Sequence, residues 1–178
     1  MIGNIVFLDI ENTIIDDLVN RNFLEDNCER IKNWLKKGDN NYTVSFNTWG
    51  WTKTKEVDEE LVKAMYDKLE VPVENRASFC DVLVKEHSVE VAIQNGWLNK
   101  EDKERAMFPG MMQEFGIDKI SCFTSMVSGS VTNDMISDVD PLHPLTFWLI
   151  DDLVHEFESL TWFGGKLEVC VMNPKEVQ

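Results

Sequence analysis

The stretch NIVFLDIENTIIDD, residues 4–17, constrains the fold of this chain more than any other. The apolar run from Ile2 to Ile10 is too short and too rich in β-branched residues for a helix, so it predicts a strand buried on both faces. Asp9 lies at the end of this run, and Glu11 follows two residues later. The pattern therefore predicts a parallel sheet whose first strand delivers carboxylates to its carboxyl end.

The rest of the chain alternates between strand and helix patterns. Apolar residues at helical spacing predict helices over 24–37, with Asn22 as the expected cap, and over 56–71. A further helix is expected over 151–163, and a mostly helical insertion or cap over about 78–115. Strands are expected over 42–47, 119–126, 145–150 and 166–172. This order predicts a single α/β domain over residues 1–178, a three-layer sandwich with a mostly parallel, Rossmann-like sheet and a helical insertion.

Composition limits the classes of function. The chain has 178 residues, the size of one domain, and no apolar run approaches the roughly 20 residues that span a bilayer. With no signal-peptide pattern at its start, a cytoplasmic location is expected, and the four widely spaced cysteines are expected to be reduced core thiols. The formal net charge of −15 disfavours binding to extended nucleic acid. A small phosphorylated ligand held by a divalent cation remains compatible with that charge.

Polar side chains follow three of the predicted strands. Asp9 ends the first, Ser45, Asn47 and Thr48 lie at the end of the second, and Asp151 and Asp152 follow the strand LTFWLI. Carboxyl ends of parallel strands share one edge of a sheet, where α/β proteins bind their ligands. Clustered carboxylates repel one another unless a cation such as Mg²⁺ neutralises them, so a metal site is expected there. An alternative for Asp152 is that it caps the helix expected after this strand.

Three of these segments resemble motifs of the haloacid dehalogenase-like (HAD) hydrolase superfamily. VFLDIENTI resembles its first motif, an apolar strand ending in DxDxT; YTVSFNT resembles its second; and FWLIDD resembles its fourth. The resemblance covers both ends of the chain and leaves about 80–140 unmatched. It implies a Mg²⁺-dependent phosphohydrolase that acts on a small phosphorylated substrate, for example a nucleotide, through an aspartyl-phosphate intermediate.

The resemblance also implies a role for each matched residue. Asp9 would be the nucleophile, and Glu11 would stand at the place of the general acid and base. Mg²⁺ would be held by Asp9, the backbone carbonyl of Glu11 and Asp151, with Asp152 in support. The residues that would contact the phosphate are Ser45 or Thr48, and Lys119.

Two departures from the motifs leave other functions open. The family's phosphatases usually carry Asp where this chain has Glu11, and residues 120–165 contain no lysine or arginine, which leaves Lys119 as the nearest basic residue before the acidic strand end. One alternative is a metal-dependent nuclease of the PIN/NYN type, whose first strand can end in D-x-E-N, as DIEN does here. Another is a degenerate HAD-like scaffold that binds a ligand or partner and catalyses nothing.

Overall fold

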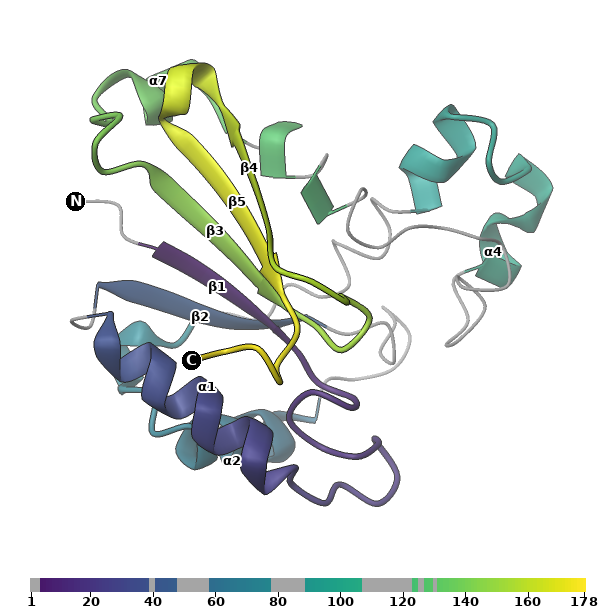
Figure 1. Ribbon diagram of the computed structural model, residues 1–178. Helices are drawn as coiled ribbons and strands as arrows, with labels where there is room; N and C mark the ends of the chain where they lie inside the picture. Colours follow the sequence, from purple (N-terminus) through teal and green to yellow (C-terminus); the bar gives the residue numbers. More distant parts are fainter. Residues whose placement is uncertain are drawn as a thin grey trace.

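The computed structural model describes residues 4–38, 41–47, 58–77, 89–106, 123–124, 127–129 and 131–178. A five-stranded sheet in the order β2-β1-β3-β5-β4 forms its centre (Figure 1). The first four strands in this order are parallel, and β4 runs antiparallel to β5. The predicted α/β class with a mostly parallel sheet is therefore confirmed. The strand bounds are β1 Asn4–Asp9, β2 Tyr42–Asn47, β3 Leu145–Ile150, β4 Glu158–Trp162 and β5 Leu167–Met172.

Apolar side chains cover both faces of this sheet. Successive residues of a strand point to opposite faces, so Leu8 and its partner Ile150 contribute to one cluster while Phe7 and its partner Leu149 contribute to the other. The Leu8 cluster includes the apolar faces of α1 (Glu25–Lys37) and α2 (Glu59–Lys68). Burial on both faces explains why β1 and β3 are almost entirely apolar until they reach their carboxyl ends.

The two long helices agree with the predicted ranges 24–37 and 56–71. Asp58 caps α2 by accepting a hydrogen bond from the Leu61 amide at 3.0 Å. The predicted cap of α1 is wrong, because Leu24 occupies that position without a side-chain hydrogen bond, and Asn22 instead pairs with Asp16. The short helices are η1 Val73–Asn75, η2 Lys100–Asp102, α4 Lys103–Ala106, α7 Asn133–Ser137 and η3 Phe163–Gly165.

The helix predicted over 151–163 is wrong. The chain turns after β3 and then forms β4, which pairs with β5 through a turn at Gly164 and Gly165. Both glycines have positive φ angles of 67° and 85°, which side chains disfavour. The predicted strand over 119–126 falls mainly outside the described residues, and the part that is described, residues 123–124, is helical.

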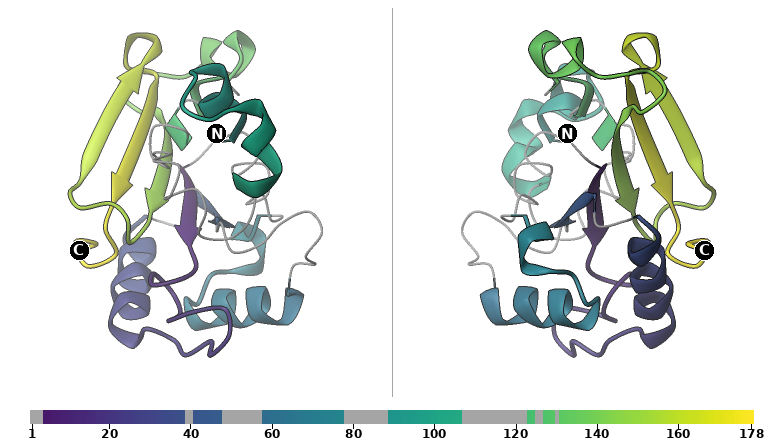
Figure 2. Two further views of the ribbon diagram at one scale, coloured as in Figure 1. Left: turned by 90° about the vertical axis from the view of Figure 1, so that its right-hand side faces the viewer. Right: turned by 90° about the vertical axis from the view of Figure 1, so that its left-hand side faces the viewer.

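Described residues of the expected insertion, 89–106, are mainly helical and have a small apolar cluster of their own. Figures 1 and 2 show this segment well apart from α1 and α2. Whether the segment acts as a cap stays a prediction.

Two cysteines lie in the described part of the chain, Cys28 and Cys170, and both are buried free thiols, as expected. Burial raises the pKa of Cys28 to about 11 and that of Cys170 to about 12, so neither is a reactive thiolate near neutral pH. Cys80 and Cys122 lie outside the described residues. Among the helices that are described, none is long and apolar enough to cross a membrane.

Candidate metal and phosphate site

The sheet topology brings the ends of β1 and β3 together. From β1 the chain continues through α1 to β2 on one side, whereas from β3 it continues to β4 and β5 on the other side. Neighbouring strands whose connections leave in opposite directions form the crevice where α/β proteins bind ligands. Asp9 is the last residue of β1, and Asp151 directly follows β3, so both stand at this crevice.

Three carboxylates converge at these strand ends. Asp9, Asp151 and Asp152 each offer an oxygen within 4.8 Å of the other two. The Asp9 and Asp151 side chains are 4% and 1% exposed, and Asp152 is half-buried. Negative charges this close and this far from water repel strongly, and a cation between them removes that cost. The structure thus brings together three of the four residues that the sequence offered as metal ligands.

A buried threonine connects two of these acids. The Thr13 hydroxyl donates a hydrogen bond to Asp9 Oδ2 at 3.3 Å and accepts one from the Asp152 backbone N–H at 3.2 Å. The tight loop after β1 makes this possible, because Asn12 takes a positive φ of 59° and the Ile14 amide returns to the Ile10 carbonyl. Thr13 therefore holds the loop after β3 against the end of β1.

Backbone hydrogen bonds fix the loop that carries Asp151 and Asp152. The Asp151 amide donates to the Met172 carbonyl, which extends the β3–β5 ladder by one bond, and Asp151 Oδ1 accepts from the Leu153 amide at 2.9 Å. Asn173 Nδ2 donates to the carbonyls of Asp152 and Val154. No helix begins at this loop, so the alternative interpretation of Asp152 as a helix cap is wrong.

Two of the other predicted site residues, Glu11 and Ser45, lie in the described part of the chain and differ in burial. Glu11 is partly exposed and lies outside the group of three carboxylates; no other acidic, histidine or cysteine side chain in the described ranges joins that group. Ser45 is buried beside Phe7, two residues before the end of β2. Thr48 and Lys119 lie outside the described residues.

Asn47 is a site residue to which the sequence assigned no role. It is the Cα partner of Asp9 in the β1–β2 ladder, so both side chains leave the same face of the sheet. The Asn47 side chain is fully buried, and neither its Nδ2 nor its Oδ1 has a hydrogen-bond partner among the described residues. Its place at a strand end was visible in the sequence, but its unpaired state is visible only in the structure.

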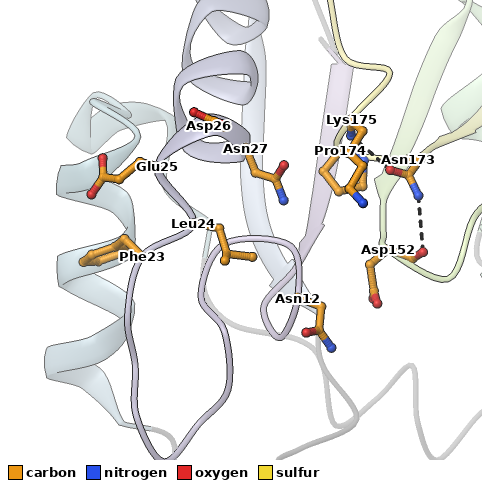
Figure 3. Close-up of a pocket in the computed structure, with 10 residues that line it drawn as sticks. All are labelled: Asn12, Phe23, Leu24, Glu25, Asp26, Asn27, Asp152, Asn173, Pro174 and Lys175. Atoms are coloured by element: carbon orange, nitrogen blue, oxygen red, sulfur yellow. Dashed lines mark hydrogen bonds between the residues drawn. The ribbon is translucent and has the colours of Figure 1, made fainter.

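A cavity of about 700 Å³ borders this site (Figure 3). It opens between the amino end of α1 and the loops after β3 and β5, and its lining includes Asp152, a member of the carboxylate cluster, together with Asn12 from the loop after β1. Lys175 contributes a positive charge to its lining. A second cavity of about 910 Å³ lies at the amino ends of the strands, where Asn4 and Leu145 line it. The first cavity is therefore the one next to the acidic cluster.

Comparisons of this chain with protein-family models, with curated proteins and with solved structures found no match.

Proposed function

We propose that this protein is a Mg²⁺-dependent phosphohydrolase of the HAD-like type that acts on a small phosphorylated substrate. The observation that carries the proposal is the convergence of Asp9, Asp151 and Asp152 at the carboxyl ends of β1 and β3. We further propose that the sheet, with an apolar cluster on each face, belongs to a three-layer Rossmann-like sandwich.

The donor set fits Mg²⁺. All three side chains of the cluster offer carboxylate oxygens, the hard ligands that Mg²⁺ prefers, and Mg²⁺ is commonly held by one or two carboxylates with waters and substrate phosphate. Asp9 and Asp151 would hold the ion, with Asp152 in support. The bound ion would supply positive charge against the cluster and against the phosphoryl oxygens.

The residues of the chain would carry out the reaction in two displacements. In the first, an Asp9 carboxylate oxygen attacks phosphorus, the bond from phosphorus to the ester oxygen breaks, and Glu11 gives its proton to the departing oxygen. In the second, Glu11 takes a proton from water, and the water oxygen displaces Asp9 from phosphorus to release inorganic phosphate. The partial exposure of Glu11 is compatible with contact to a leaving group that faces solvent.

The net charge supports a small substrate. A chain with charge −15 repels a polyanion along its whole surface, whereas one phosphoryl group at a bound cation is affected mainly by that cation. A nucleotide is one candidate of this size.

The test is the formation of a phosphoryl-mimic adduct on Asp9. The protein is incubated with Mg²⁺ and beryllium fluoride, and bound fluoride is followed by ¹⁹F NMR. We expect a bound signal in the wild type and in Asp16→Asn, which removes a partly exposed acid of the same loop region, and none in Asp9→Asn.

The same experiment separates the alternatives. Cleavage of single-stranded nucleic acid that depends on Asp9, without an adduct and without monophosphate hydrolysis, would replace the proposal with a metal-dependent nuclease. Absence of an adduct and of any hydrolysis in a broad phosphoester panel would favour a binding protein that catalyses nothing.

A further inference from the structure

The amide of Asn47 is the strongest unexplained polar group in the described part of the chain. Its side chain is 0% exposed, and neither its donor Nδ2 nor its acceptor Oδ1 has a hydrogen-bond partner among the described residues. A buried polar group without a hydrogen bond destabilises a fold, because it gives up its bonds to water and gains none. Such groups are rare in folded proteins, and each calls for an explanation.

Other buried asparagines show what a structural role requires. Asn75 donates from Nδ2 to the Tyr42 carbonyl at the opposite end of β2, and Asn27 donates to the Thr13 carbonyl at 3.1 Å. Both side chains therefore stabilise a neighbouring loop or strand. Asn47 has no comparable bond to any described residue, so a role in stabilising a neighbouring element does not account for its polarity.

The position of Asn47 relates it to the acidic cluster. It is the register partner of Asp9, and both side chains leave the same face at the carboxyl end of the sheet. Ionised Asp9, Asp151 and Asp152 can only accept hydrogen bonds, so a phosphoryl group beside them needs neutral donors as well as a cation. Nδ2 of Asn47 is such a donor, and it carries no charge that would compete for the cation.

We propose that Asn47 is a ligand-binding residue of this site, an inference that rests on the proposed function. Its Nδ2 donates to a phosphoryl oxygen, and its Oδ1 accepts from an O–H group that enters with the ligand. That O–H group belongs either to a hydroxyl of the substrate next to its phosphate or to a water bound together with the phosphate. Both ends of the amide are satisfied only in the complex, so binding removes a cost that the ligand-free fold carries.

The test combines stability with binding in two matched asparagine variants. Asn47→Leu replaces the amide by an apolar side chain of similar size, and Asn75→Leu does the same at a buried amide of η1 that is hydrogen-bonded to the other end of β2. Without ligand, Asn47→Leu should raise the melting temperature by a few degrees, and Asn75→Leu should lower it. Binding of inorganic phosphate with saturating Mg²⁺, measured by calorimetry, should weaken at least tenfold in Asn47→Leu and stay unchanged in Asn75→Leu.

A pair of ligands identifies the O–H group. If it belongs to the substrate, the wild type binds a nucleoside 3′-monophosphate at least tenfold more tightly than the 2′-deoxy compound, and Asn47→Leu loses this preference. If it belongs to water, the two ligands bind alike while phosphate affinity still depends on Asn47.

Two results keep this inference apart from the proposed function. If Asn47→Leu lowers the melting temperature and keeps full phosphate affinity, Asn47 is structural and the inference is overturned, even where the wild type hydrolyses phosphoesters. If phosphate binding depends on Asn47 but the wild type hydrolyses nothing, the inference stands and only the proposed catalysis fails.

Discussion

At the scale of single residues, the site depends on groups that are buried at strand ends. Asp9 and Asp151 combine nearly complete burial with close approach to each other, an arrangement that a fold tolerates when a cation or a proton offsets the charges. Thr13 is the neutral side chain that bridges the two loops of the site.

Replacement of Thr13 tests the bridge. Thr13→Val keeps the shape but removes the hydroxyl, so Asp9 Oδ2 loses a donor and the Asp152 amide loses an acceptor, at a cost of about 1–3 kcal/mol in the free energy of unfolding. Mg²⁺ affinity should fall by roughly 10- to 100-fold, the usual effect of losing a group that orients metal ligands. Urea unfolding and calorimetry measure the two quantities. Thr43→Val, on an exposed position of β2, is the control and should change stability by less than about 0.5 kcal/mol. Equal effects in both variants would contradict a bridging role for Thr13.

Replacement of Glu11 tests acid–base catalysis. Glu11→Gln removes the titratable proton and should slow turnover by about 10²- to 10⁴-fold, most of all for substrates with poor leaving groups. Glu11→Asp should preserve or raise phosphatase activity, because it restores the reach that the family motif implies. Steady-state kinetics on two esters of different leaving-group pKa check both statements. If Glu11→Gln keeps full activity on both esters, another group protonates the leaving oxygen.

The acids of the site were predictable from the sequence because they interrupt apolar runs, and parallel strands deliver their carboxyl ends to one edge. Asp9 and Asp151 could therefore be placed near each other without coordinates. The lack of hydrogen bonds between the Asn47 amide and other described residues could not be predicted from the sequence, since the partners of a buried polar group come from several elements. The sequence pointed instead to Ser45, the hydroxyl of the same strand.

At the scale of elements, local patterns predicted the helices and strands where the period was clear. Strand β3 matches its predicted range, and α1 agrees to within one residue. The segment that contains β4 was misassigned because Val154, Phe157 and Leu160 fit a helical spacing, while Leu160 and Trp162 also fit the alternation of a strand. The segment forms a strand because it pairs with β5, and this tertiary contact outweighs local propensity.

The contribution of the α2 cap, Asp58, to the free energy of unfolding depends on pH. The hydrogen bond from the Leu61 amide lowers the pKa of Asp58 below its ordinary value of 3.8, and the ion pair with Arg21 lowers it to a smaller extent. The unfolded chain therefore takes up this proton first, so the charge of Asp58 stabilises the fold above about pH 4 and that contribution is lost as pH falls further.

Two variants separate the charge from the cap. Asp58→Asn keeps an acceptor for Leu61 but not the charge, so it should be about 0.3–1 kcal/mol less stable than the wild type near neutral pH and equal to it at low pH. Asp58→Ala loses the cap itself and should be less stable by about 0.5–2 kcal/mol throughout. Urea unfolding from pH 2 to pH 7 gives the comparison, and a difference that does not change with pH in Asp58→Asn would refute the role of the charge.

At the scale of the whole molecule, the strand order was not predictable from local patterns. The order depends on which faces of the strands and helices pack against one another. Each of the two apolar clusters on the sheet contains residues from segments that lie far apart in the sequence. This order places β1 between β2 and β3, so that Asp9 has Asn47 on one side and Asp151 on the other. The net charge of −15 adds self-repulsion, which monovalent salt screens.

We propose that one divalent cation binds at the carboxyl ends of β1 and β3, between Asp9 and Asp151. The direct measurement is the Mg²⁺ dependence of the melting temperature, at constant ionic strength so that general screening does not contribute. At 100 times the dissociation constant, binding stabilises the fold by about 2.7 kcal/mol, a rise of roughly 5–10 °C for a chain of this size.

The variants assign this rise to the site. We expect it in the wild type and in Asp138→Asn, which neutralises an exposed carboxylate beside the second cavity, and we expect its loss in Asp9→Asn and in Asp151→Asn. A wild type that gains no stability from Mg²⁺, or a rise that survives in both Asp9→Asn and Asp151→Asn, would contradict a cation site at these strand ends.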